Sequence, residues 1–552
     1  MRTRPLAVFA FILIASIAAF AQRELGVKPT DTGGPLTYEQ AAYDVQSYDI
    51  ALDVDPAAKS IKGSVVMRAK IVVPTNVIRL DLDTVYKIER VSEEQADRKY
   101  EFKDGKIWVW FPQTKQPGES FSLSIHYAGT PREAPRPPWV GGFMWKKTPS
   151  GADWISVALQ NDGADLMFPC KDHPSDKASH VQMHITVPDP LVATGPGKLK
   201  GSVKNKNGTT TYNWEMNTPI PNYSIVFNAA PYKLIRDSYR SIAGETMPIE
   251  FYILPEDFEK GARLIEEQKK YIAFFEKYLG PFPFRAEKVG ITETPHLGME
   301  HSTNIAYGNG FRSNEDGTDW LLLHEFGHEY WANLVTASDW RDFWIHEGFE
   351  TYMDTLYTEH LHGKEAYMKA MAARSRAFKN RQPVAPREQK FAYQVYMSEP
   401  DYLSSDGDIY GKGAYFLHTL RYYIGDDAFF RALRRMAYPT KEMERITDGR
   451  QTRLVNTDDF LNIAEAESKM KLDWLFEMYL RQPKLPRLIT EAADGTLKLR
   501  WETPNGMAFP MPVDVVIDGK PKRVAMDNGT GSVEFTGDIP KVDPNEWVLK
   551  AK

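Results

Sequence analysis

The hydrophobic periodicity of this chain changes twice along its 552 residues, and that change most constrains the fold. Between about residues 43 and 232, apolar side chains alternate at period two over short runs such as residues 48–55. The turn-forming pairs Asp104-Gly105 and Asn207-Gly208 separate such runs. This pattern predicts a β domain of many short antiparallel strands.

The spacing becomes helical after about Gly244, most clearly over residues 258–279. The proline-rich stretch 481–486 ends the last helical segment, because proline cannot continue a helix. From Leu488 onward the pattern is that of β-strands again, with a turn at Asp518-Gly519.

We therefore predict a multidomain α+β chain, since one hydrophobic core rarely grows beyond about 250–300 residues. The predicted boundaries give an antiparallel β domain at residues 22–239, a mainly helical domain at 240–486 and a small β-sandwich at 487–552.

The first residues form a targeting pattern. Arg2 and Arg4 precede an apolar run at 6–18, and Ala19-Phe20-Ala21 has the A-x-A form of a cleavage site. We expect residues 1–21 to be a signal peptide, Gln22 to begin the mature chain, and export to the periplasm or the extracellular space. The alternative is an uncleaved membrane anchor, but a spanning helix needs roughly 20 apolar residues. No later segment is long and apolar enough, so we expect no stable membrane insertion.

Composition excludes some functions. A net charge of −6 gives no support to a nucleic-acid partner, which calls for a basic stripe. The single cysteine, Cys170, excludes an intrachain disulfide. It follows Phe168-Pro169, and this apolar setting predicts a buried, inert thiol rather than a nucleophile.

A strongly apolar segment, residues 321–331, is predicted to be a helix and carries the motif His324-Glu325-x-x-His328. On a helix, histidines at i and i+4 lie one turn apart on the same face, so both imidazoles can reach one cation. Glu325 is displaced around the helix and can face a water molecule on that cation. A His-acid-x-x-His pattern is expected by chance about 0.035 times in such a chain.

A second helical pattern at residues 342–352 carries Glu347. Two antiparallel helices joined by a short loop would place Glu347 opposite His324 and His328. Two histidines and one carboxylate, with a fourth position left for water, make a catalytic zinc site for one ion, although this ligand set suits several transition metals. The structural alternative is a helix pair with buried, hydrogen-bonded histidines.

These residues resemble the aminopeptidase N-like family of gluzincins. The zinc signature is His324 to His328, then eighteen residues, then Glu347; Asn333-Leu334-Val335-Thr336 and Trp344-x-x-Glu347-Gly348-Phe349 follow the flanking pattern. The resemblance implies a saddle-like β domain, a thermolysin-like catalytic domain and a small β-sandwich. Many members add a helical C-terminal domain for which this chain leaves no room, so the three-domain form and a more open cleft are expected.

The segment Leu297-Gly298-Met299-Glu300-His301 stands in the place of the family's Gly-x-Met-Glu-Asn. The resemblance implies that it is an edge strand beside the cleft, that Gly298 and Met299 contact the substrate, and that Glu300 binds the substrate's α-amino group. A fixed carboxylate that pairs with an ammonium selects chains with a free N-terminus. Leu297 and His301 depart from the family pattern.

Two more segments match. Residues 410–414 are similar to the family's Tyr-x-Lys-Gly, which implies that the Tyr410 phenol hydrogen-bonds the oxyanion. Gln160 lies ahead of Phe168-Pro169-Cys170, where the family has Gln or Glu that assists Glu300. Asp165 and His173 replace the family's usual Arg and Glu, and we expect them to affect loop packing more than chemistry.

The sequence therefore predicts a zinc-dependent aminopeptidase that hydrolyses the N-terminal bond of peptides with a free α-amino group, with Glu325 as general base. Peptides are the expected partners, and the sequence sets no oligomeric state. The alternatives are a zinc endopeptidase, against which Met299-Glu300 argues, and a hydrolase of epoxides, known in one branch of the family. A secreted binding protein with an inactive protease domain is a third, against which the intact set of residues argues.

Overall fold

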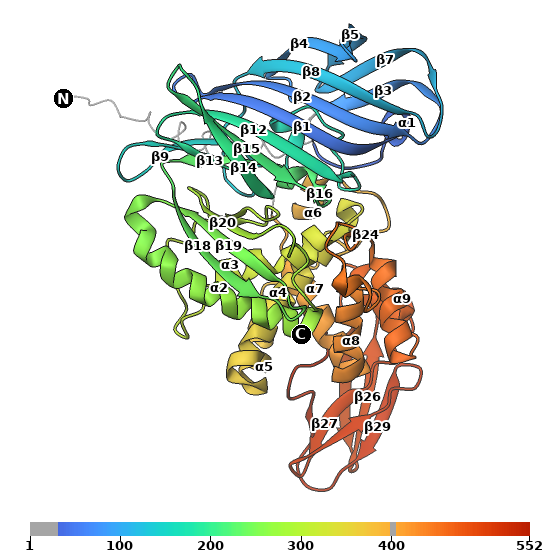
Figure 1. Ribbon diagram of the computed structural model, residues 1–552. Helices are drawn as coiled ribbons and strands as arrows, with labels where there is room; N and C mark the ends of the chain where they lie inside the picture. Colours follow the sequence, from blue (N-terminus) through green and yellow to red (C-terminus); the bar gives the residue numbers. More distant parts are fainter. Residues whose placement is uncertain (1–30, 398–404, 552) are drawn as a thin grey trace, which may run out of the picture.

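The computed structural model describes residues 31–397 and 405–551. The predicted signal peptide at 1–21 and the predicted start at Gln22 lie outside the described residues. Figure 1 shows an elongated molecule with the N-terminal sheets at one end, a mainly helical body in the middle and a small all-β part at the other end. This is the α+β arrangement that the periodicity predicts.

The largest N-terminal sheet has eight strands in the order β14-β15-β12-β1-β2-β8-β4-β5. Buried and more exposed side chains alternate along most of strand β1, as expected for a strand with one face on the core. All neighbours are antiparallel except β1 and β12, which pair in parallel because the chain returns to β1 only after a long crossover. The strands are β1 (Tyr43–Asp55), β2 (Ser60–Ile71), β4 (Tyr86–Glu93), β5 (Ala96–Asp97), β8 (Ser120–Gly129), β12 (His180–Pro188), β14 (Lys198–Lys204) and β15 (Thr209–Met216).

Smaller sheets complete this end of the molecule, and the short helix α1 (Tyr38–Ala41) precedes β1. One has the order β3-β7-β6, one β13-β17-β10-β9, and one pairs β11 with β16. The predicted turns Asp104-Gly105 and Asn207-Gly208 join β6 to β7 and β14 to β15. The strands are β3 (Thr75–Asp81), β6 (Lys99–Lys103), β7 (Lys106–Lys115), β9 (Gly142–Lys147), β10 (Asp153–Ala158), β11 (Lys177–Ala178), β13 (Val192–Thr194), β16 (Ile220–Pro221) and β17 (Asn228–Ala230).

A five-stranded sheet, β18-β19-β20-β22-β21, begins the middle part. Its last member, β21, is an edge strand paired antiparallel with β22, as the resemblance implied for this segment. The strands are β18 (Lys233–Arg240), β19 (Thr246–Ile253), β20 (Val289–Glu293), β21 (Gly298–Met299) and β22 (Ile305–Tyr307).

Helices make up the rest of the middle part, with the two-stranded pair β23 (Val335–Ala337) and β24 (Arg453–Val455). The helix predicted at residues 258–279 is α2 (Phe258–Leu279), whose buried residues recur at helical spacing. The others are α3 (Trp320–Gly327), α4 (Trp344–His362), α5 (Lys364–Arg374), α6 (Ala392–Tyr396), α7 (Asp408–Ile424), α8 (Asp426–Ala437), α9 (Thr457–Ser468) and α10 (Asp473–Leu480).

Helix α3 is shorter than its apolar run suggests. The Asp319 side chain caps its start by accepting hydrogen bonds from the N–H groups of Leu321 and Leu322. It ends at Gly327, and the following turn has non-helical backbone angles at Trp331 and Ala332. The apolar character of these residues reflects burial in the core rather than a continuous helix.

Two three-stranded sheets, β25-β26-β29 and β28-β27-β30, form the C-terminal part. The pair Asp518-Gly519 turns β27 into β28, as predicted. Its strands are β25 (Arg487–Ala493), β26 (Thr496–Glu502), β27 (Val513–Ile517), β28 (Lys520–Val524), β29 (Thr530–Glu534) and β30 (Lys541–Val542). The boundaries at 239/240 and 486/487 stay predictions; the sheet system changes between β17 and β18, and the helices end before β25.

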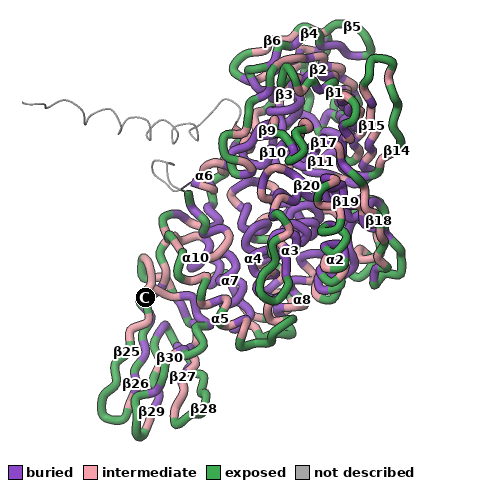
Figure 2. Tube along the Cα trace, turned by 90° about the vertical axis from the view of Figure 1, so that its left-hand side faces the viewer, coloured by how far each residue is buried: buried purple, intermediate pink, exposed green. Residues whose placement is uncertain are grey.

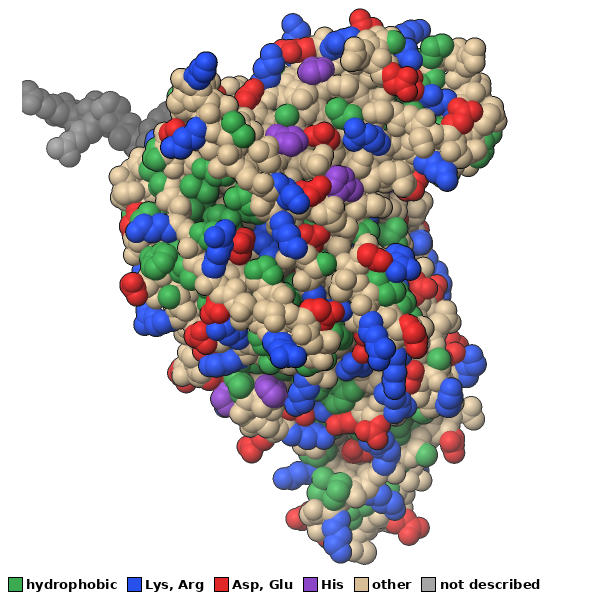
Figure 3. All heavy atoms as spheres, in the orientation of Figure 1, with side chains coloured by type: hydrophobic (Ala, Val, Ile, Leu, Met, Phe, Trp, Pro, Cys, Tyr) green, Lys and Arg blue, Asp and Glu red, His purple; other side chains and the backbone are tan. Residues whose placement is uncertain are grey.

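Buried hydrophobic side chains form one continuous cluster through the described residues, and burial is densest around α3, α4 and β20 (Figure 2). Cys170 is fully buried within this cluster, as predicted. Acidic and basic side chains are interspersed over the face drawn in Figure 3. Among the described residues, no helix is long and apolar enough to cross a membrane.

Candidate active site

One cavity between the N-terminal sheets and the helical body collects the side chains that the sequence singled out. The nine predicted site residues all line it: Gln160, Gly298, Met299, Glu300, His324, Glu325, His328, Glu347 and Tyr410. They come from the loop after β10, the edge strand β21 and Glu300 directly after it, helix α3 and its C-cap His328, helix α4, and helix α7. Pro138 and Trp139, at the end of a proline-rich loop, line it as well.

The three predicted metal ligands converge. His324 Nε2 and His328 Nε2 lie 3.3 Å apart, and Glu347 Oε2 lies 3.7 Å from the first and 3.4 Å from the second. Atoms bound at ~2.0–2.1 Å to one tetrahedral ion lie about 3.3 Å from each other. The three donor atoms are therefore spaced as one metal ion requires. The short loop predicted between the two helices was wrong, because residues 328–343 form a longer connection that contains β23 and two short helical turns.

The outward ring nitrogens fix how both imidazoles point. His324 Nδ1–H donates to Asp354 Oδ2 at 3.0 Å, and His328 Nδ1–H donates to the Trp331 carbonyl at 2.9 Å. Both Nε2 atoms then carry lone pairs that face each other, an arrangement that repels unless a cation lies between them. Glu347 Oε2 is buried among the same atoms without a hydrogen bond. The donor set fits a metal ion.

Glu325 lies on the inner side of α3 against the edge strand. Burial raises the pKa of its carboxyl, while the nearby His324 and His328 lower it. Gly298 passes so close that a Cβ there would stand 2.4 Å from Glu325 Oε1. The glycine of this segment therefore makes room for the carboxylate, a physical reason for its position.

Glu300 is 2% exposed and accepts hydrogen bonds from Gln160 Nε2 and from the Tyr223 hydroxyl at 3.0 Å. Asn333 Nδ2 donates to the Glu300 backbone carbonyl at 3.0 Å, which fixes the chain at this point. Burial raises the pKa of Glu300. We call Glu300, Gln160 and Tyr223 the amine clamp, after the role that the resemblance implies for Glu300 and Gln160.

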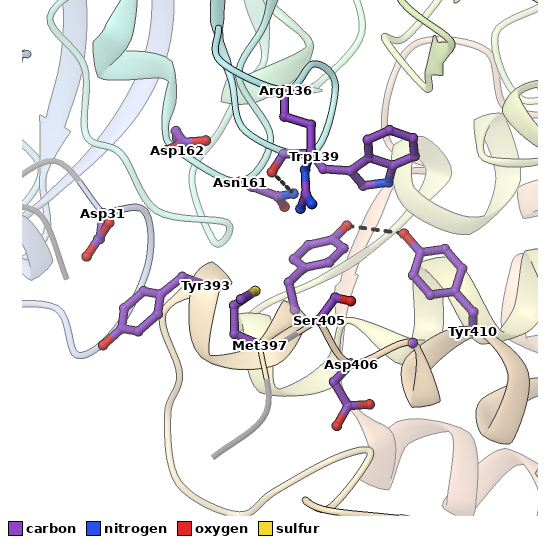
Figure 4. Close-up of a pocket in the computed structure, with 12 residues that line it drawn as sticks. Asp31, Arg136, Trp139, Asn161, Asp162, Tyr393, Met397, Ser405, Asp406 and Tyr410 are labelled. Atoms are coloured by element: carbon purple, nitrogen blue, oxygen red, sulfur yellow. Dashed lines mark hydrogen bonds between the residues drawn. The ribbon is translucent and has the colours of Figure 1, made fainter. Parts of the chain in front are cut away.

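Tyr410 lines the cavity from the first turn of α7, and its hydroxyl donates to the Tyr396 hydroxyl at 3.5 Å. Figure 4 shows this hydrogen bond in a second pocket that both tyrosines also line. Burial raises the pKa of Tyr410 well above its ordinary value, and the charge of Glu347 adds to the shift. The phenol stays protonated at neutral pH and can donate a hydrogen bond.

The two departures in the edge-strand segment differ in position. Leu297 lines the cavity, whereas His301 is fully buried and is not among the lining residues. Burial lowers the pKa of His301 well below its ordinary value, so the ring is neutral. Of the other departures, His173 contacts the loop at Gly34 through Nε2, at 3.0 Å.

Three contributing residues escaped the sequence reasoning: Tyr223 in the amine clamp, Asp354 behind His324, and Tyr396. Asp354 follows Glu347 by two helical turns on α4, so helical spacing could have revealed it. Tyr223 and Tyr396 carry no comparable local signal.

The fold and the site together define the active site of a metal-dependent hydrolase. Two histidines and Glu347 can bind the ion, and a second carboxylate, that of Glu325 on α3, lies beside them. Residues 44–224 match the peptidase M1 N-terminal domain, and residues 263–479 match the peptidase family M1 domain. These two profiles of one family together match more than two thirds of the chain, which belongs to peptidase family M1.

Over the aligned regions, about a quarter of the residues of these relatives are identical to those of this chain. A leucine aminopeptidase 2 of Vanderwaltozyma polyspora is 25% identical over 342 residues, which are 58% of this chain and 48% of the relative. The human glutamyl aminopeptidase is 24% identical over 419 residues, 72% of this chain and 41% of the relative. The chain thus spans about half the length of the curated relatives it matches.

A solved M1 zinc metallopeptidase of Deinococcus radiodurans, a mutant with a bound Tyr-Ser-Ala substrate, has a similar fold. Its TM-score is 0.66 at 22% identity, and the match covers 83% of this chain and 98% of that one. This likeness supports the arrangement of the N-terminal sheets and the helical body.

Proposed function

We propose that this protein is a zinc aminopeptidase, which hydrolyses the first peptide bond of peptides with a free α-amino group. The side chains of His324, His328 and Glu347 lie close enough together to bind one metal ion, and relatives of the family are named aminopeptidases. The proposed roles are those expected from the sequence: His324, His328 and Glu347 hold the ion, and Glu325 is the general base.

One observation carries the proposal: the amine clamp is very close to the hydrolytic groups. Carboxylate and imidazole atoms of Glu300, Glu325 and His328 all lie within 4.8 Å of one another. In a peptide, the α-amino nitrogen is only two bonds, or about 2.5 Å, from the first carbonyl carbon. An ammonium held by Glu300 therefore places the first peptide bond, and no later one, beside Glu325.

The side chains divide the work as follows. Glu300, Gln160 and Tyr223 orient the ammonium, which converts a bimolecular encounter into a positioned one. Glu325 takes a proton from the attacking water and passes it to the leaving amine. Tyr410 donates a hydrogen bond to the oxygen that becomes negative, and removing one such donor typically costs about 10²–10³ in rate.

A zinc ion bound by His324, His328 and Glu347 would supply a Lewis acid for the carbonyl oxygen and lower the pKa of water. Buried imidazoles and a buried carboxylate whose lone pairs converge support this ion.

The test compares two peptides of one sequence, one with a free N-terminus and one acetylated, with and without a zinc chelator. We expect release of single residues from the free peptide only, and loss of that activity on chelation. Internal cleavage of both peptides would instead establish an endopeptidase. Absence of cleavage by zinc-loaded protein across a broad peptide set would overturn the proposal.

We also propose that the protein is exported, on the basis of the charged, apolar and A-x-A pattern of residues 1–21. N-terminal sequencing of protein from fractionated cells tests this. A chain that starts at Gln22 outside the cytoplasm supports export, and a cytoplasmic chain that retains its first residues contradicts it.

A further inference from the structure

Tyr396 lies at the centre of the site although no motif contains it. It is the last residue of the short helix α6, and its ring packs edge-on against Phe343 with centroids 5.1 Å apart. The Phe343 carbonyl accepts the N–H of Glu347 at 3.2 Å, so Tyr396 packs against the start of the helix that carries a metal ligand.

The hydroxyl of Tyr396 reaches three parts of the site. It lies 3.2 Å from Gln160 Oε1, 3.3 Å from Glu347 Oε1 and 3.5 Å from the Tyr410 hydroxyl, which donates to it. The dashed line at the Tyr410 hydroxyl in Figure 4 marks the last of these contacts. A hydroxyl has one proton to donate, so Gln160 and Glu347 compete for it.

Both acceptors are buried: Gln160 is 2% exposed and Glu347 is 3% exposed. A buried acceptor that loses its donor is costly, because no water replaces the hydrogen bond. Glu347 uses Oε2 toward the two imidazoles, so the bond from Tyr396 to Oε1 restricts how the carboxylate can rotate. Partners of this kind, behind a metal ligand, typically contribute 10–100-fold to metal affinity or activity.

Gln160 depends on the same hydroxyl for its orientation. Its Nε2 donates to Glu300 while its Oε1 accepts from Tyr396, so the two bonds together decide which end of the amide faces Glu300. Without Tyr396, the amide loses the partner that distinguishes its oxygen from its nitrogen.

We propose that Tyr396 is a positioning residue whose single hydroxyl proton is shared between the metal ligand Glu347 and the clamp residue Gln160. The part that concerns Gln160 rests on the proposed aminopeptidase function. The part that concerns Glu347 requires only that the three ligands bind a metal ion.

The test variant is Tyr396→Phe, which keeps the ring against Phe343 and removes only the hydroxyl. Tyr393→Phe is the matched control: it removes a hydroxyl from the same helix, and the Tyr393 ring points away from Tyr410 in Figure 4. Zinc affinity is measured by competition with a chromophoric chelator, which needs no peptidase activity. We expect the dissociation constant for zinc to rise about 10–100-fold in Tyr396→Phe and to stay at the wild-type value in Tyr393→Phe.

Kinetics at saturating zinc supply the second readout. We expect Tyr396→Phe to raise KM for free-amine peptides more than it lowers kcat, because ammonium binding and not the proton transfer is disturbed. A folded Tyr396→Phe protein with wild-type zinc affinity and wild-type KM would overturn the proposal. Weakened zinc binding in a protein whose wild type cleaves no peptide would overturn the aminopeptidase function while supporting the role at Glu347.

A second variant keeps the idea testable if Tyr396→Phe does not fold. Gln160→Leu removes the competing acceptor, so the Tyr396 proton goes to Glu347 alone. We expect zinc affinity equal to or tighter than that of the wild type, together with a raised KM. Zinc binding weakened tenfold or more in folded Gln160→Leu would contradict the shared-hydroxyl arrangement.

Discussion

Replacing Gly298 by alanine should damage catalysis without removing the metal. Strand β21 passes so close to α3 at this residue that a Cβ would stand 2.4 Å from Glu325 Oε1 and 2.8 Å from Leu321 Cδ1. Gly298 does not have the left-handed backbone conformation that favours glycine, so an alanine there causes no backbone strain. The effect of the substitution is therefore steric and falls mainly on the proposed general base.

The size of the effect follows from the overlap. The contact with Glu325 must lengthen from 2.4 Å to at least 3.0 Å, by movement of the carboxylate or of the strand. A misplacement of about 1 Å in a catalytic group can cost on the order of 10² in rate, so kcat should fall about 10- to 100-fold. Overpacking of this kind also costs about 1–3 kcal/mol of unfolding free energy.

The assay combines kcat on a free-amine peptide, zinc content by mass spectrometry and a thermal unfolding curve. We expect bound zinc, a lowered midpoint and the kcat loss. The Glu325→Gln background is the control: if Gly298→Ala acts through Glu325, it should lower kcat little further there. A kcat within twofold of wild type in folded, zinc-loaded Gly298→Ala would refute the steric reasoning.

Three further substitutions have defined outcomes. Glu325→Gln should retain zinc and lose about 10²–10⁴ in kcat, the usual contribution of a general base; substantial turnover by the metal-loaded variant would remove Glu325 from that role. Glu300→Gln should lower kcat/KM for free-amine peptides about 10- to 100-fold, since a charged hydrogen bond contributes about 1.5–3 kcal/mol, and an unchanged kcat/KM in the folded, zinc-loaded variant would remove Glu300 from amine binding. Gly327→Ala would bring a Cβ within 1.9 Å of the Glu350 carboxylate, which is buried without hydrogen bonds. Gly327→Ala should lower the unfolding free energy, measured in urea, by about 1–3 kcal/mol. The loss should be smaller when Glu350→Ala has already removed the overlapping carboxylate, and an equal loss with and without Glu350→Ala would contradict the overlap.

The metal centre was predictable because its geometry is local. Helical spacing alone places His324 and His328 on one face. Glu347 lies in the next α-helix along the chain, although the connection at residues 328–343 is longer than predicted. The three strand-turn-strand units at Asp104-Gly105, Asn207-Gly208 and Asp518-Gly519 were predictable for the same reason: two residues suffice to specify the turn.

The parallel pairing of β1 with β12 was not predictable from alternation. A period of two reports only which face of a strand is buried and is the same for parallel and antiparallel neighbours. The length of α3 was likewise overestimated, because apolar residues around Trp331 are buried by tertiary packing whether or not the backbone there is helical.

The amine clamp and Tyr396 show where sequence patterns stop being informative. Tyr396 and Gln160 are 236 residues apart, Gln160 and Glu300 are 140 apart, and Tyr223 and Glu300 are 77 apart. Helical and strand periodicities constrain neighbours within a few residues, so they contain no information about which loop meets which helix. The family resemblance implies a role for Glu300 and Gln160 because their motifs recur in the family. It implies no role for Tyr396, which lies in none of these motifs. Its role follows only from three distances around one hydroxyl, and those distances exist only after the N-terminal sheets and the helical body have packed together.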